Sequence, residues 1–375
     1  MNVETIQSLE ELEALAPEWR RLPLPTPMQS PEWLIAWQRA YADSVDQELC
    51  VLAMRDAVGR LAGLAPWRIE RRPMIGATLR WIGDGRASTD HHTLLCEEAD
   101  RDSVVDAAAD WLVTHAGETW RRMRLEAVDE DDPTMNGLER RLIEAGLDSE
   151  RVSDLGSFLA PLRDEQGEAT WDGYLKLLSK NRRKKLRKLR REFFESGRAS
   201  IRIVTTEEER QHWWPTLVRL HAERRQSMGE QGVFDCPRFN HFHEMASRDM
   251  LAEGRLYFAV LELDGEPVAV EYAPQDDQTI YAYQGGIAAS ALELGAGHAS
   301  LLGLVDNAIN SGHVRLDLLR GDEPYKLSWG ATHRGASTLH VRPRTMAGAM
   351  ERWASTAYRR LRDRKSNKAM AAQDV

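Results

Sequence analysis

Residues 260–274 read VLELDGEPVAVEYAP, and this stretch decides the fold because the chain contains its pattern twice. The earlier copy is residues 52–66, LAMRDAVGRLAGLAP. Each copy is an apolar run, a turn that contains Asp and Gly, and a second run that ends in Ala-Pro. This pattern is typical of two antiparallel strands joined by a tight turn. Asp56 corresponds to Asp264 at the same offset that relates the final prolines, so the sequence predicts two copies of one hairpin.

The elements that follow each hairpin also come in one order: a strand that ends in glycine, a helix and a further strand. They are residues 77–85, 104–116 and 124–128 in the first half, and residues 278–286, 298–310 and 315–319 in the second. A repeat of this length indicates duplicated domains rather than a solenoid. Helices mixed with antiparallel strands in each copy predict an α+β fold with a mixed sheet.

A polar stretch that contains glycine, residues 162–170, marks the expected boundary between the two copies. We therefore expect a first domain at residues 1–163 and a second at residues 164–345. Residues 346–375 are expected to form a C-terminal helix followed by a flexible, polar and basic tail.

Composition restricts the classes of protein to consider. The 375 residues carry a net charge of −9, and no window offers about 18 consecutive apolar residues, so we expect no membrane span. The acidic N-terminus is unlike a secretory signal. The three cysteines are widely spaced and lack metal-ligand spacing, which predicts a reducing compartment, the cytoplasm, and no metal site. The pair His91-His92 stands alone and adds no zinc pattern.

Several motifs of the second half resemble those of a known family. They are LLSKNRRKKLRKLRREFFESG (177–197), LHAERRQSMGEQGVF (220–234), YAYQGG (281–286), AINSG (308–312) and DLLRGDEPYKLSWG (317–330). With the repeated layout, these motifs resemble the CelD-like acetyltransferases, which are named for cellulose biosynthesis and are related to the FemAB aminoacyltransferases. The resemblance covers residues 173–343 well and the first half loosely. It implies tandem GNAT domains, a GNAT acyltransferase domain in the second half and an acyl-CoA donor, most simply acetyl-CoA.

The resemblance also implies where the donor binds. GNAT domains hold the pantetheine arm at a splayed strand, expected here at residues 280–284, and the pyrophosphate at the start of the next helix. Leu292 stands where the usual GNAT signature has Gln or Arg. Gly295 and Gly297 have an alternative role as a flexible turn into the helix. The first half has the acidic stretch 97–102 (EEADRD) at the matching place and is expected to be degenerate for CoA. The predicted donor-binding residues are Tyr283, Gln284, Gly285, Gly295, Ala296, Gly297 and His298.

Acyl transfer needs a base for the acceptor and an acid for the departing thiolate. Tyr325 follows the fifth strand, where GNAT enzymes often place the acid. Glu271 and Asp317 lie on or at the end of neighbouring strands, and either is a candidate base. Each has a structural alternative: Tyr325 as a packed aromatic residue and Asp317 as a turn cap.

Four basic side chains are predicted to contact the acceptor or another anionic ligand. Residues 180–191 (KNRRKKLRKLRR) predict a densely basic helix, on which Arg182 interrupts the apolar stripe. His221 and Arg225 precede an expected loop at 226–232, and Lys326 follows Tyr325. A solvated outer helix face and a packed histidine are the structural alternatives.

Three functions are therefore compatible with the sequence. The first is an acyl-CoA-dependent N- or O-acyltransferase whose acceptor is a sugar, a polysaccharide or a cell-envelope precursor. The second keeps the fold but takes aminoacyl-tRNA as the donor, as the FemAB relatives do, and is favoured by the basic helix. The third is a non-catalytic adaptor of an exopolysaccharide assembly.

Overall fold

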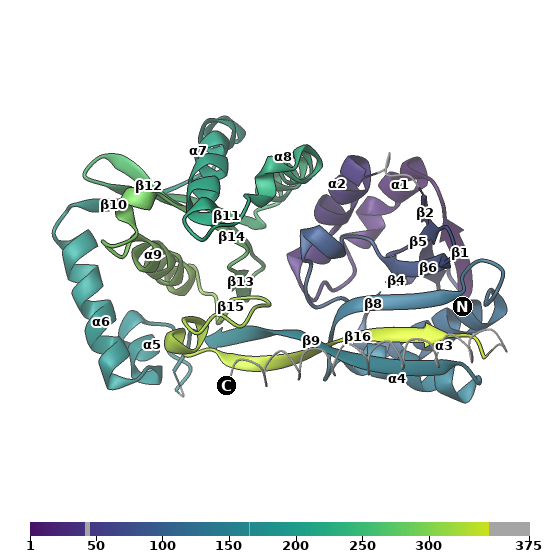
Figure 1. Ribbon diagram of the computed structural model, residues 1–375. Helices are drawn as coiled ribbons and strands as arrows, with labels where there is room; N and C mark the ends of the chain where they lie inside the picture. Colours follow the sequence, from purple (N-terminus) through teal and green to yellow (C-terminus); the bar gives the residue numbers. More distant parts are fainter. Residues whose placement is uncertain (42–45, 165, 345–375) are drawn as a thin grey trace, which may run out of the picture.

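The computed structural model describes residues 1–41, 46–164 and 166–344. The predicted C-terminal helix and tail, residues 346–375, lie outside the described residues. In the described part the chain forms two halves that stand side by side on one long sheet (Figure 1). No helix among these residues is long and apolar enough to cross a membrane.

The first half contains four helices and nine strands in the described ranges. Its helices are α1 (Leu9–Trp19), α2 (Pro31–Tyr41), α3 (Arg101–Thr114) and α4 (Pro133–Glu144). Its strands are β1 (Asn2–Ile6), β2 (Gln47–Leu49), β3 (Val51–Arg55), β4 (Leu61–Ala65), β5 (Trp67–Arg72), β6 (Gly76–Trp81), β7 (Leu95–Cys96), β8 (Arg122–Asp129) and β9 (Asp148–Pro161).

The second half repeats this order with additional helices at its start. Its helices are α5 (Trp171–Leu177), α6 (Lys180–Arg190), α7 (Glu207–Gln226), α8 (Pro237–Ala252) and α9 (Ala296–Asn310). Its strands are β10 (Ala199–Ile203), β11 (Leu256–Leu263), β12 (Glu266–Pro274), β13 (Thr279–Tyr281), β14 (Gln284–Ile287), β15 (Arg315–Asp317) and β16 (Thr332–Arg342).

The predicted hairpins are confirmed. β3 and β4 pair antiparallel, with Leu52 opposite Ala65, and β11 and β12 pair antiparallel, with Val260 opposite Val270. The predicted α+β class with a mixed sheet is also confirmed, because the long sheet contains parallel and antiparallel neighbours.

One strand prediction was wrong in detail. Residues 278–286 were expected as a single strand but form β13 and β14, which belong to different sheets. The backbone leaves one sheet at Ala282 and Tyr283 and enters the other, because each strand finds its partner on a different side.

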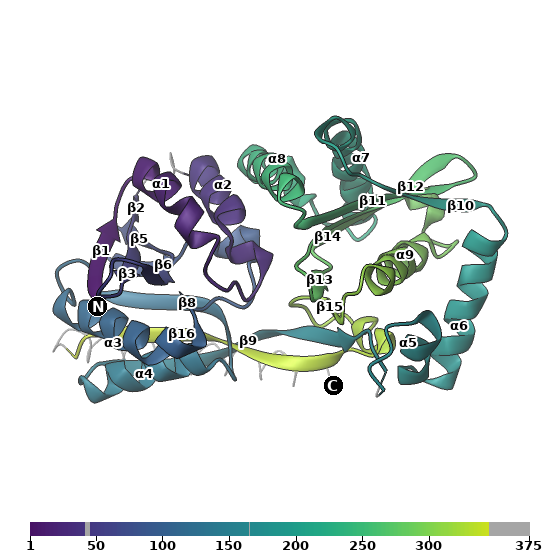
Figure 2. The same ribbon diagram turned by 180° about the vertical axis from the view of Figure 1, so that it is seen from behind.

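The long sheet joins the halves through their last strands. Its order is β13-β15-β9-β16-β8-β6-β5-β2. β9, from the first half, pairs with β15 of the second, and β16, the last described strand, pairs with β8 of the first. Each half therefore supplies a strand to the other, and Figure 2 shows β9 and β16 running along the base of both halves.

A shared apolar core also connects the halves. α2 packs against α8, and the Trp33 ring lies edge-on to Phe242, His243 and Tyr283 at centroid distances of 5.0–5.2 Å. Burying large aromatic side chains removes much apolar surface from water. The contact therefore holds the two halves in one arrangement.

Candidate functional site

Two strands of the second half, β14 and β15, diverge into different sheets. β13 runs parallel to β15, and the last bond between them is donated by the Ala282 amide to the Asp317 carbonyl at 2.8 Å. Beyond it, β14 pairs with β12 alone and forms the edge of its four-stranded sheet. Figure 1 shows β14 in the upper sheet and β15 in the long sheet below. This fork leaves one backbone edge of β14 free for an extended ligand.

The helix that follows the fork begins with unpaired amides. Gly295 adopts φ +83°, a left-handed conformation that favours glycine, and makes no side-chain cap. The amides of Gly295 and His298 bond within the turn, whereas Ala296 and Gly297 have no amide partner among the described residues. A Cβ at Gly297 would lie 2.5 Å from Ile287 Cδ1, so a larger residue here would have to displace that end of the Ile287 side chain. Two of the four expected amides are free to bind an anion at a positive helix end.

Arg182 lies at the same helix end. Its guanidinium carbon is 4.4 Å from the centroid of the Trp329 ring, and the His298 ring is 6.2 Å from that ring. Nε and one terminal nitrogen of Arg182 are buried without a hydrogen-bond partner among the described residues. Burial lowers the pKa of Arg182, and the charges of Arg182 and Lys185 add to burial in lowering the pKa of His298. Burying a cation without a hydrogen-bond acceptor costs free energy. These unpaired nitrogens therefore indicate a binding site for an anion.

Glu271 lies on β12, the strand that pairs with β14, opposite Gly285. A Cβ placed on the opposite residue, Gly285, would be 3.4 Å from Glu271 Oε2. Burial raises the pKa of Glu271 to about 7, and a hydrogen bond from Ser300 on α9 partly offsets this rise. Burial also raises the pKa of Tyr325 to about 12, with a contribution from the negative charges of Glu323 and Glu271. Tyr325 is 41% exposed, and no hydrogen bond joins it to Glu271 among the described residues.

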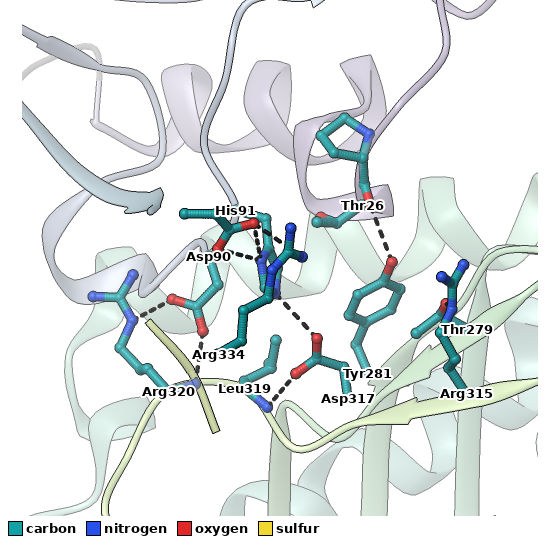
Figure 3. A network of polar contacts seen from close by, with 12 residues as sticks. Thr26, Asp90, His91, Thr279, Tyr281, Arg315, Asp317, Leu319, Arg320 and Arg334 are labelled. Atoms are coloured by element: carbon teal, nitrogen blue, oxygen red, sulfur yellow. Dashed lines mark hydrogen bonds and ion pairs between the residues drawn. The ribbon is translucent and has the colours of Figure 1, made fainter. Parts of the chain in front are cut away.

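Asp317, the third predicted catalytic residue, is held in a separate polar network (Figure 3). Its carboxylate accepts hydrogen bonds from the Leu319 amide at 2.7 Å and from His91 Nε2 at 3.1 Å. His91 Nδ1 is 2.9 Å from both carboxylate oxygens of Asp129. Burial favours neutral His91, but its bonds to Asp129 and Asp317 raise its pKa to about 10. Asp317 therefore binds an imidazolium between the halves, and no contact joins it to Glu271 among the described residues.

Lys326, predicted to bind a substrate, instead forms hydrogen bonds and an ion pair within its own loop. Its ammonium donates to the carbonyl oxygens of Leu319 and Arg320 at 3.0 and 2.7 Å and pairs with Glu323 at 2.9 Å. An ammonium has three donors, so this set uses all of them. Arg320 in turn forms an ion pair with the buried Asp90 of the first half (Figure 3).

Tyr283 and Gln284, predicted to bind the donor, point away from α9. The Tyr283 hydroxyl donates to the Ala87 carbonyl at 2.6 Å and lies 3.2 Å from His243 Nε2. Gln284 lies opposite Tyr272 on the face of the sheet that α7 covers. The side chain of Tyr283 is thus occupied by the contact between the halves, and the backbone of this segment is what a donor would meet.

The predicted pair His221 and Arg225 is on α7. His221 is 2% exposed and lies edge-on to Phe234 at 5.1 Å. Burial lowers the pKa of His221 to about 4, so it is neutral near pH 7. Arg225 is at the surface and pairs with Glu230 at 2.7 Å. His221 matches its structural alternative, a packed histidine, and Arg225 stands apart from Glu271 and Arg182.

Sequence reasoning assigned no role to Ser300, Trp329 or His91, which the structure places at the two sites. Ser300 is three residues after Gly297 on α9, a spacing that would have placed it on the same helix face as the glycine. His91 carried no such signal, because its partner Asp317 is 226 residues away in the chain.

Comparisons with known proteins agree with this architecture. Residues 180–327 match the family described as Acetyltransferase (GNAT) domain, and no curated protein matches the chain. The structure of FemX aligns with a TM-score of 0.62 at 11% identity, over 90% of this chain and 97% of FemX. A conserved protein of unknown function from Bacteroides thetaiotaomicron aligns with a TM-score of 0.57 at 10% identity, over 91% and 99% of the chains. The C-terminal domain of a proposed lysylphosphatidylglycerol synthetase from Agrobacterium fabrum gives 0.54 at 13% identity, over 93% and 97%. At these identities the alignments show a shared fold.

Proposed function

We infer that this chain, an acyltransferase with a GNAT acetyltransferase domain at residues 180–327, takes its acyl group from acyl-CoA. The observation that carries the inference is the fork between β14 and β15, which lies beside a helix end with two unpaired amides. An extended pantetheine arm can pair with the free backbone edge of β14. The diphosphate then meets the start of α9, where a positive helix end and backbone N–H groups favour anions.

Arg182 supplies charge at this helix end. We assign it to the phosphates of the donor rather than to the acceptor, because its unpartnered nitrogens lie beside Trp329 and His298. A guanidinium that binds phosphate oxygens through two parallel hydrogen bonds satisfies both nitrogens at once. Donor binding would then relieve the cost of burying this cation.

Glu271 and Tyr325 have complementary roles in the proposed reaction. A carboxylate with a pKa of about 7 can accept a proton from an acceptor amine or hydroxyl near neutral pH. The acceptor nitrogen or oxygen then bonds to the acyl carbon, and the carbon–sulfur bond breaks. Tyr325, protonated because its pKa is about 12, donates its proton to the departing thiolate.

The acceptor class rests on the resemblance to the CelD-like family. We propose an amine or hydroxyl of a sugar, a polysaccharide or a cell-envelope precursor. The geometry of Glu271 fits either nucleophile, because the base removes one proton from nitrogen or oxygen alike.

Isothermal titration of the full chain with acetyl-CoA tests the donor. We expect saturable binding that weakens on the order of 10-fold or more in Arg182→Met, because a charge-assisted hydrogen bond contributes about 1.5–3 kcal/mol. Arg187→Met is the matched control: Arg187 is exposed on the same helix and should change affinity little. Absence of binding by acetyl-CoA and by longer acyl-CoAs would contradict the proposal.

The basic face of α6 supports a second candidate donor, aminoacyl-tRNA. Lys184, Arg187 and Lys188 are exposed on this helix and form a positive surface. Binding through phosphates must weaken steeply as salt rises. Filter binding with aminoacyl-tRNA therefore separates the donors, and a tRNA affinity that does not fall with added salt would exclude this candidate.

A further inference from the structure

A cavity of about 360 Å³ lies between the two halves, next to the network of Figure 3. The first half contributes the starts of α3 and α4 and the end of β7, and the second half contributes β13 and β15. We propose that this cavity binds a small molecule through a compact oxyanion, either a carboxylate or a phosphate monoester.

Two guanidinium groups on the cavity wall lack a strong carboxylate partner. Arg315 donates from Nε to Thr279 Oγ1 at 3.2 Å, and it forms no ion pair with any carboxylate in the described ranges. Arg101 has one described partner, Glu98, at 3.5 Å, and the Glu98 side chain is 87% exposed. An ion pair of that kind contributes little. Both cations are therefore available to a ligand's oxygens.

A buried hydroxyl without a partner is also found here. Thr93 lines the cavity, is 8% exposed, and its hydroxyl has no hydrogen-bond partner among the described residues. Buried polar atoms are rarely left unpaired. The Thr93 hydroxyl therefore adds one unpaired polar group to the two cations on the cavity wall.

The carboxylates on the wall are already engaged by protein groups. Asp129 and Asp317 share the proton-bearing His91, and Asp129 also pairs with Arg334 at 3.1 Å. Asp132 accepts hydrogen bonds from two backbone amides at the start of α4. Because these negative charges are compensated locally, they do not prevent an oxyanion from binding near Arg101 and Arg315.

The cavity is distinct from the proposed donor site. Tyr281 and Asp317 line the cavity, whereas the alternate residues Ile280 and Leu316 are buried in the cluster that contains α9. Side chains that alternate along a strand point to opposite faces. The cavity and α9 therefore lie on opposite faces of β13 and β15, and this site does not overlap the proposed donor site.

Titration calorimetry with the full chain tests the site. Inorganic phosphate, methyl phosphate and acetate are titrated separately, with glycerol as a neutral control. We expect phosphate or acetate to bind and glycerol not to bind, and the arm that binds identifies the oxyanion. Arg315→Met and Arg101→Met should each weaken binding about 10-fold or more, since each removes a charged donor.

Three further variants make the result decisive. Thr93→Val preserves shape, removes the unpaired hydroxyl and should also weaken binding. Arg71→Met, at an exposed pair with Glu48 outside this cavity, should bind as the unmodified chain does. Arg182→Met should lose acetyl-CoA affinity and keep oxyanion affinity, so the two sites fail separately. Absence of binding up to about 10 mM, or equal affinity in Arg315→Met, would overturn the proposal.

Discussion

Replacing Glu271 by Gln should stabilise the protein, and the gain should grow with pH. The folded chain raises the pKa of this carboxyl from 4.5 to about 7 through burial. Below about pH 4.5 the carboxyl is neutral in both the folded and the unfolded chain, so burial has no ionic cost. As the pH rises toward 7 the unfolded chain ionises first, and native stability falls. Above pH 7 this loss is complete.

The magnitude follows from the two pKa values. One pKa unit corresponds to about 1.4 kcal/mol, so the ionised carboxylate destabilises the folded chain by at most about 3 kcal/mol at pH 8. The same relation predicts that the advantage of Glu271→Gln grows by roughly 2 kcal/mol between pH 5.5 and pH 8.

Urea unfolding of both proteins at a series of pH values measures this difference. Glu266→Gln is the matched control, because Glu266 is on the same strand with its side chain in solvent, and its difference should stay flat. The glutamine variant should also lose about 10²–10⁴-fold in acyl transfer, since a positioned base is removed. A Glu271→Gln difference that does not depend on pH would refute the burial of this carboxyl.

Three other predictions concern separate parts of the structure. Tyr325→Phe keeps the ring but removes the proton donor, so kcat for acyl transfer should fall by roughly 10²-fold or more while the affinity for acetyl-CoA is retained, as steady-state kinetics and calorimetry together would show. Arg320→Met leaves Asp90 buried without its cation and should destabilise the chain by about 3 kcal/mol, whereas adding Asp90→Asn should recover most of that loss in thermal unfolding. The raised pKa of His91, about 10, means that its contribution to stability is fully present below pH 6.5 and is lost as the pH rises toward 10. The melting temperature of His91→Asn should therefore approach that of the unmodified chain between pH 7 and 10, and a constant gap would count against the bridging imidazolium.

Local patterns predicted the repeated elements well. The hairpins of β3–β4 and β11–β12 depend on apolar runs and a turn that are contiguous in the chain, so the pattern suffices. The basic helix was predicted at residues 180–191 and is observed at Lys180–Arg190 for the same reason.

Local patterns could not predict which strands pair when they are distant in the sequence. The exchange of β9 and β16 between halves depends on which strand edges meet, and the apolar alternation of a strand does not encode its partner. The same limit explains why residues 278–286 were expected as one strand, although β13 and β14 belong to different sheets.

The predicted roles of the site residues stay predictions. The start of α9 follows the fork, and Glu271 lies opposite Gly285 of β14, as their places on consecutive elements indicated. The sequence did not show which groups bind Asp317 and Lys326, and these partners determine what the two side chains do. His91 from the first half binds Asp317, and the carbonyl oxygens of Leu319 and Arg320 in its own loop bind Lys326.

Residue-resolved hydrogen exchange with and without acetyl-CoA tests the central claim most directly. The amides of Ala296 and Gly297 have no partner among the described residues and should exchange quickly in the free protein. Saturation with acetyl-CoA should slow their exchange, together with amides of β14. Saturable binding of acetyl-CoA that leaves these amides unprotected would contradict the placement of the donor at the fork and the start of α9.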